Sequence, residues 1–120
     1  MKYVYALSFL LALTAVTAQT YTTENDDFNI DAVTADPQKL KEITDCFVDA
    51  GVCSPVVAEF KKDLPEVFET ACKKCTDKQK VILRKYMTAL KSTQQAEYQA
   101  IINKYDSQGK YINALETAIA

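Results

Sequence analysis

Four cysteines, Cys46, Cys53, Cys72 and Cys75, constrain this chain more than any other feature of its sequence. An even number of cysteines in a small secreted chain predicts two disulfides, which compensate for a modest core. Three pairings are open. Joining each cysteine to its neighbour in sequence would contribute about 2.5 and about 2 kcal/mol on the chain-entropy model. Joining Cys46 to Cys72 would close a longer loop and stabilise more, so the residues alone leave the pairing open.

The first 18 residues have the pattern of a secretory signal peptide. Lys2 gives a positive start, residues 3–16 carry no charge, and Val16-Thr17-Ala18 places small residues at a cleavage site. The uncharged stretch is shorter than the roughly 20 residues of a membrane span. We therefore expect a secreted, extracellular protein with one mature domain, residues 19–120, and no stable membrane insertion.

The pair Cys72-x-x-Cys75 also has the spacing of a zinc knuckle or of a redox motif. An all-cysteine zinc site usually has two such knuckles, whereas Cys46 and Cys53 are separated by six residues. A thioredoxin-like motif needs a βαβ setting, and the sequence shows no strand pattern. Oxidation outside the cell favours disulfides over both alternatives. We expect neither a metal nor another cofactor.

The distribution of charge and the scarcity of certain residue types argue against several classes of function. Without Lys2, 13 basic and 16 acidic side chains remain, a net charge of −3, and the two signs are interspersed. This pattern is typical of a solvated surface and not of a nucleic-acid interface. No histidine and only two glycines are present, so a His-based triad and a Gly-rich phosphate loop are excluded. An enzyme would have to use carboxylate pairs such as Asp45 with Asp49 or Glu66 with Glu69, whose helix faces look solvated. We expect no catalytic activity.

Helix-start signals recur along the chain. Asp36-Pro37 and Ser54-Pro55 each place an N-cap before a proline at the first helical position, and Thr76-x-x-Gln79 is a capping box. Asp63-Leu64-Pro65-Glu66 resembles a box that restarts a helix in the middle of the chain. Ser92-x-x-Gln95 is a weaker box of the same kind.

Apolar residues follow helical spacing in every segment between these signals. Leu40, Ile43 and Phe47 form one stripe, and a second runs through residues 98–105. No window alternates with a period of two residues, the signature of a strand. Gly51 is expected to end the first long helix, and Gly109 to lie in a turn. The sequence predicts an all-α fold, a compact bundle of about six short helices.

The spacing Cys46-x6-Cys53-x18-Cys72-x2-Cys75 resembles the insect chemosensory protein family, also called the olfactory-segment D type. Tyr21-Thr22-Thr23 is similar to the start of that family. The runs 72–79 and 104–111 are similar to its most recognisable motif and its closing motif. The similarity covers residues 21 to 111. It implies a six-helix fold with the local disulfides, Cys46–Cys53 and Cys72–Cys75, around an apolar channel for long-chain compounds.

The chain departs from the family at several positions. The family commonly has tryptophan where this chain has Tyr98, and often tyrosine in place of Ile43. Its proline in the closing turn is Ser107 here. Within a variable C-terminal tail, residues 112–120, the mostly apolar residues 114–120 replace the family's usual charged tail. These departures affect the shape of the pocket and the choice of ligand rather than the fold.

From the residues alone, a filled bundle and a hollow one look the same, and only the resemblance implies a cavity between the stripes. Nine side chains are expected to line it: Ile43, Phe47, Phe60, Leu64, Phe68, Ile82, Tyr86, Tyr98 and Ile102. Tyr86 and Tyr98 are the expected polar contacts, because a phenol carries one hydroxyl on an apolar body.

The expected function is that of a carrier for small, long-chain apolar ligands such as fatty acids, alcohols, aldehydes and pheromone- or odorant-like molecules. Burying a twelve-carbon chain gains about 9 kcal/mol. Association costs leave a dissociation constant around micromolar or weaker. The alternative is a secreted interaction or developmental signalling protein that acts through a receptor or another protein. In that case residues 112–120 would dock the partner or self-associate, whereas the carrier is expected to be mostly monomeric.

Overall fold

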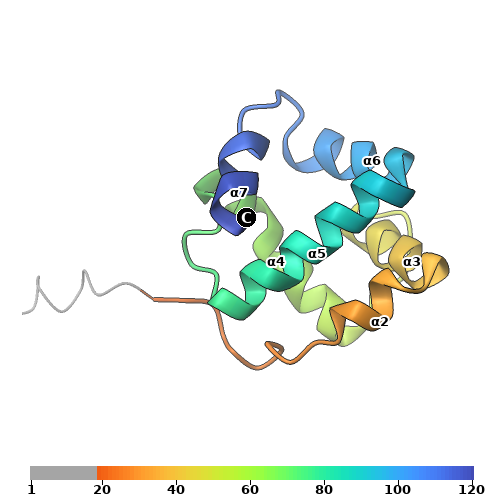
Figure 1. The fold of residues 1–120 in the computed structure, drawn as a ribbon, viewed down its shortest axis with the longest axis horizontal. Helices are drawn as coiled ribbons and strands as arrows, with labels where there is room; N and C mark the ends of the chain where they lie inside the picture. The colour runs from red at the N-terminus through yellow and green to blue at the C-terminus, as the bar shows by residue number, and fades with distance from the viewer. Residues whose placement is uncertain (1–18) are drawn as a thin grey trace, which may run out of the picture.

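The computed structural model describes residues 19–120, so the expected signal peptide, residues 1–18, lies outside the described residues. The described chain contains six helices and no strand (Figure 1). They are α2 (Ile30–Thr34), α3 (Pro37–Phe47), α4 (Pro55–Thr70), α5 (Asp77–Thr93), α6 (Gln95–Tyr105) and α7 (Ile112–Ile119). The expected all-α fold of about six short helices is confirmed.

Three of the sequence signals cap helices as predicted. The Asp36 carboxylate accepts hydrogen bonds from the backbone at the start of α3, and the Ser54 hydroxyl does so at the start of α4. Thr76 and Gln79 form a complete capping box on α5. Each cap satisfies backbone N–H groups that have no partner within the helix, which fixes where the helix begins.

Two other helix boundaries differ from the sequence prediction. Helix α4 runs without interruption through Asp63 and Glu66, so the proposed restart is wrong and Pro65 lies inside the helix. The expected box at Ser92 is also wrong, because α5 continues to Thr93 and the Ser92 hydroxyl donates to the carbonyl of Thr88. In α4 the apolar face is continuous through Leu64, Val67 and Phe68, and burial of that face outweighs a weak local cap.

The end of α3 likewise differs from the expected stop at Gly51. The helix ends at Phe47, and Asp49, with φ of 63°, takes the left-handed conformation that reverses the chain. Aspartate is one of the few non-glycine residues that tolerate this region. The predicted turn at Gly109 is confirmed, since its φ is 67°.

The helices are arranged around two long ones that are not a closely packed pair. Helix α5 packs against α2, α6 and α7, whereas α4 packs against α3, α6 and α7. In Figure 1, α5 crosses the front of the molecule and α4 passes behind it. Helices α6 and α7 each contact both long helices. Residues of α4 and α5 also border a common space together with residues of α2 and α3.

Candidate functional site

Two disulfides tie together neighbouring segments of the chain. Cys46 bonds to Cys53, with Cα atoms 5.0 Å apart, and Cys72 bonds to Cys75, with Cα atoms 5.1 Å apart. The local pairing implied by the resemblance is therefore confirmed. The first bond joins the end of α3 to the loop before α4, and the second closes the connection between α4 and α5. Neither bond crosses the bundle, so α4 and α5 can separate by repacking side chains without breaking a covalent link.

An apolar pocket lies between α3, α4 and α5, with α2 and the N-terminal segment along its rim. Its free volume is about 80 Å³. Fifteen side chains line it: Tyr21, Phe28, Ile30, Ile43, Phe47, Val57, Phe60, Asp63, Leu64, Val67, Cys75, Gln79, Ile82, Leu83 and Tyr86. Most of these are aliphatic or aromatic, which is typical of a site for small apolar molecules.

Six of the nine side chains singled out from the sequence border this pocket. They are Ile43, Phe47, Phe60, Leu64, Ile82 and Tyr86. They come from the apolar stripes of α3, α4 and α5, where residues three or four apart share a face. The structure thus brings together the part of the expected set that lies on these three helices.

The other three residues, Phe68, Tyr98 and Ile102, lie outside the pocket. Phe68 is buried and stacks on Tyr105, with ring centroids 5.6 Å apart. The Tyr98 hydroxyl donates to a carboxylate oxygen of Glu116 on α7, 3.2 Å away. Ile102 packs against the core from α6. Helical spacing predicted that these side chains face inward, and they pack against the core, but Phe68 contacts Tyr105 of α6 and Tyr98 contacts Glu116 of α7.

Sequence reasoning missed nine lining residues: Tyr21, Phe28, Ile30, Val57, Asp63, Val67, Cys75, Gln79 and Leu83. The stripes could have supplied Val57, Val67 and Leu83, which lie three or four residues from expected members. The capping box predicted Gln79 as a helix-start residue but not as a lining residue, and no local pattern pointed to Tyr21, because long-range contacts place both residues at the pocket. The Gln79 amide donates to the Thr22 carbonyl, 2.9 Å away, which holds the N-terminal segment over the pocket.

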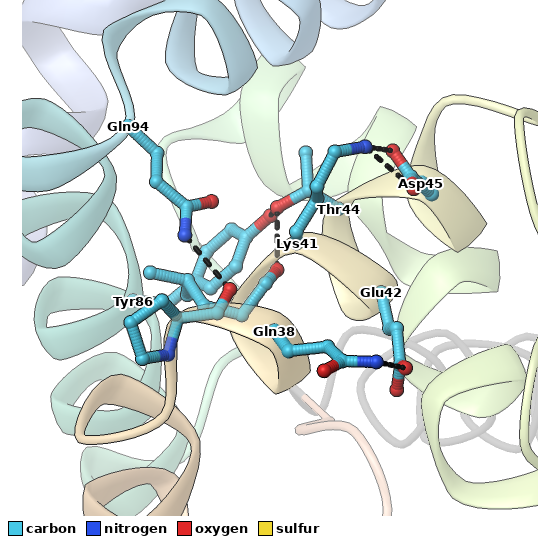
Figure 2. A network of polar contacts seen from close by, with 9 residues as sticks. Gln38, Lys41, Glu42, Thr44, Asp45, Tyr86 and Gln94 are labelled. Atoms are coloured by element: carbon cyan, nitrogen blue, oxygen red, sulfur yellow. Dashed lines mark hydrogen bonds and ion pairs between the residues drawn. The ribbon is translucent and has the colours of Figure 1, made fainter.

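Tyr86 borders the pocket, but its hydroxyl is already engaged within the protein. The hydroxyls of Tyr86 and Thr44 form a buried hydrogen bond, and Thr44 also bonds the Leu40 carbonyl at 3.0 Å (Figure 2). Because Thr44 has only one hydrogen to give and gives it to Leu40, Tyr86 is the donor in their shared bond. Burial is the main cause of the raised pKa of Tyr86. Tyr86 therefore offers the pocket its ring and not a free O–H.

Two lining residues with polar groups, Tyr21 and Asp63, lie where the N-terminal segment meets α4. The Tyr21 hydroxyl donates to a carboxylate oxygen of Glu66, 2.8 Å away, and the Tyr21 amide donates to the carbonyl of Lys74. Burial, and then the Glu66 carboxylate, raise the pKa of Tyr21. Asp63 lies one turn before Glu66 on the same helix. Its pKa is raised by partial burial and by its neighbours Glu66 and Glu59.

No other site chemistry stands out in the described chain. Residues 19–120 contain no group of three or more histidine, cysteine or acidic side chains that could hold a metal ion. All four cysteines are in disulfides. None of the helices in this part of the chain is both long and apolar enough to span a bilayer. The arrangement suits non-covalent binding of an apolar molecule.

Solved structures with the same fold include chemosensory proteins. A chemosensory protein in complex with bromo-dodecanol superposes with a TM-score of 0.75 at 28% sequence identity, covering 82% of this chain and 98% of that one. The antennal chemosensory protein A6 from the moth Mamestra brassicae gives a TM-score of 0.67 at 28% identity. It covers 82% of this chain and 92% of the moth protein.

Sequence relatives agree with the structural ones. Ejaculatory bulb-specific protein 3 of Drosophila melanogaster is 30% identical over 112 residues, which are 93% of this chain and 89% of the fly protein. Allergen Tha p 1 of Thaumetopoea pityocampa is 30% identical over 108 residues, 90% of this chain and 86% of that protein. Residues 21–113 match the sequence model of the insect pheromone-binding family, A10/OS-D, a family of binding proteins. The chain therefore belongs to the insect pheromone-binding family A10/OS-D.

Proposed function

We propose that this protein is a secreted carrier that holds one long-chain apolar molecule in the pocket between α3, α4 and α5. The observation that carries the proposal is the pocket itself, whose lining is almost entirely aliphatic and aromatic. A related protein of the same fold is described in complex with bromo-dodecanol, which supports ligands of similar length and polarity. The family relationship and the described side chains favour binding over catalysis.

The free volume sets a condition on how a ligand enters. About 80 Å³ is less than the roughly 150 Å³ of an engineered cavity that binds benzene. A twelve-carbon chain therefore fits only if the walls move apart. The local disulfides and the loose pairing of α4 with α5 permit that movement. The carrier is expected to close on release, with affinity near micromolar.

Secretion is part of the proposal. Residues 1–18 are taken as a signal peptide that is removed to leave a chain beginning at Gln19. Export to an oxidising compartment is consistent with two formed disulfides. Mass spectrometry of the protein from its source checks both points, because it reports the N-terminus and any co-purifying lipid.

Displacement of a fluorescent fatty probe by dodecanol tests the carrier function. We expect displacement at micromolar dodecanol. Failure to displace the probe at tens of micromolar would contradict the proposal. Binding without a change in helical content is also expected, because the walls shift as whole helices.

Two isoleucines provide a matched pair of variants that locates the site. Ile43 borders the pocket and Ile102 does not, although both are half-buried. Ile43→Trp is expected to fill the pocket and weaken dodecanol binding at least about tenfold, an effect of about 1.4 kcal/mol. Ile102→Trp should leave affinity within about twofold. Equal losses in the two variants would place the ligand elsewhere.

The alternative, docking of a protein partner through residues 112–120, has less structural support. Leu115 and Ile119 of α7 are buried, and α7 packs on α4 and α5 of its own chain. Leu115 and Ile119 are therefore already covered within the bundle, and Ile112 is half-buried. We propose a carrier that is mostly monomeric.

A further inference from the structure

The pocket has a marked charge asymmetry. Among its fifteen lining side chains, Asp63 is the one carboxylate, and the set contains no lysine or arginine. Asp63 is only half-buried. Its carboxylate takes part in none of the hydrogen bonds or ion pairs formed between residues 19 and 120, and its pKa shift arises from burial and neighbouring charges alone. Its oxygens are therefore free to accept a hydrogen bond.

The charges around Asp63 do not neutralise it. Two lysines are near enough to lower its pKa, Lys62 and Lys74, but each is already paired with a glutamate. Lys62 contacts Glu59 at 3.4 Å and Lys74 contacts Glu66 at 3.5 Å. Asp63 and its charged neighbours therefore comprise three carboxylates and two lysines, which leaves one negative charge in excess.

The hydroxyl groups nearby do not offset this negative charge for a ligand. The Tyr21 hydroxyl donates to Glu66, and the Tyr86 hydroxyl donates to Thr44. Both tyrosine hydroxyls of the lining therefore already donate hydrogen bonds to other groups of the protein. An anionic headgroup would meet like charge here without a phenolic donor, whereas a neutral hydroxyl would meet a free acceptor.

We propose that Asp63 sets the headgroup selectivity of the pocket, so that it binds long-chain alcohols in preference to fatty-acid carboxylates of the same length. The inference rests on the proposed carrier function and narrows its ligand class. The alkyl tail lies between α3, α4 and α5, and the alcohol hydroxyl donates to Asp63 beside Tyr21. A charge-assisted hydrogen bond of this kind is stronger than one between neutral groups.

A carboxylate ligand is repelled by Asp63, whereas an alcohol is held by the hydrogen bond. Two negative charges about 6 Å apart in a half-solvated site repel each other by about 1.4 kcal/mol at an effective dielectric constant near 40, which is about tenfold in affinity. The pocket is therefore expected to prefer the alcohol clearly, without excluding the carboxylate completely. This preference acts near pH 7, where a free fatty acid is ionised.

The experiment measures displacement of a fluorescent probe by dodecanol and by dodecanoate near pH 7. The proteins are the wild type, Asp63→Asn, and Glu69→Gln as a control that removes an exposed carboxylate further along α4. The wild type should bind dodecanol about tenfold more tightly than dodecanoate. Asp63→Asn should tighten dodecanoate binding about tenfold and should change the affinity for dodecanol less than about threefold. Glu69→Gln should behave as the wild type.

A charge reversal sharpens the test. Asp63→Lys places an ammonium at the rim, where its long stem reaches solvent, and should favour dodecanoate over dodecanol. Equal wild-type affinities for the two ligands, or an unchanged ratio in Asp63→Asn, would overturn the role of Asp63 and leave the carrier standing. If neither ligand displaces the probe from the wild type, the carrier function itself fails, and the selectivity fails with it.

Discussion

The interior of this protein has two halves that follow the same apolar spacing and yet differ in packing. We call the space between α3, α4 and α5 the pocket half, and the space where α6 and α7 cover α4 and α5 the packed half. In the packed half, Leu90, Ile101 and Leu115 are at most 1% exposed. In the pocket half, Ile43 and Ile82 border free volume and stay half-buried. Helical spacing thus selects which side chains face inward and does not decide how tightly they pack.

The difference has an architectural cause. In the packed half, α6 and α7 bridge the two long helices and fill the space between them. In the pocket half, α2, α3 and the N-terminal segment cover that space, and Phe28 of the N-terminal segment meets Phe60 edge-on. A segment held by a few hydrogen bonds is easier to displace than a packed helix. The pocket half is therefore the part suited to open.

The largest expected effect separates the two halves by stability. Leu115→Ala removes a side chain with no exposed surface and should cost about 3 to 4 kcal/mol of unfolding free energy. Leu64→Ala should cost about 2 kcal/mol, because a side chain on the wall of a void has fewer contacts to lose. Urea denaturation of both variants measures the difference. Equal costs would mean that the pocket half is packed as tightly as the other.

The next effect concerns the carboxylate that anchors α7 in the packed half. Asp106 is 2% exposed and accepts hydrogen bonds from the backbone amides of Lys110, Tyr111 and Ile112. Asp106→Asn replaces one acceptor oxygen with a donor that faces these amides, and should cost about 2 kcal/mol. Faster hydrogen exchange in α7, with dodecanol affinity unchanged, is the expected readout. A loss of affinity equal to the loss of stability would show that the halves are coupled.

Much of the fold could be predicted because its signals are local. The caps at Asp36, Ser54 and Thr76 each depend on residues within one turn, and such contacts are readable from spacing. The disulfide pairing could not be chosen from the residues alone, since loop entropy favours the longer loops. It followed from the family resemblance, and the structure confirms it.

The candidate site was harder to predict because long-range contacts define it. Phe47 and Phe68 have equally apolar surroundings in sequence, yet one borders the pocket and the other stacks on Tyr105. Asp63 was assigned to a helix start, and its place on the pocket rim depends on α4 running straight through Pro65. The packing of the helices against one another decides which half a side chain enters, and the spacing of residues along one helix does not predict that packing.

A smaller effect tests whether Tyr86 serves the pocket by its ring alone. Tyr86→Phe removes a buried hydroxyl whose partner, Thr44, keeps its bond to the Leu40 carbonyl. No donor is left unsatisfied, so the cost should be about 1 kcal/mol. Dodecanol affinity should change less than about twofold. A tenfold loss of affinity at unchanged stability would show that the hydroxyl contacts the ligand, as the sequence suggested.

The smallest expected effect lies on the surface, outside both halves. Asp49 pairs with Lys104 of α6 at 2.7 Å and with Lys61 of α4, and these contacts lower its pKa from the usual 3.8 to about 2. A carboxylate with a lowered pKa stabilises the folded state above pH 4, and the contribution disappears between pH 4 and pH 2. Asn suits the left-handed backbone at this position, so Asp49→Asn isolates the charge. Urea unfolding should show a slight loss at pH 7 that salt reduces and that vanishes near pH 2. A loss that persists at pH 2 would mean that the substitution strains the turn, and not that the ion pairs stabilise the junction of α4 and α6.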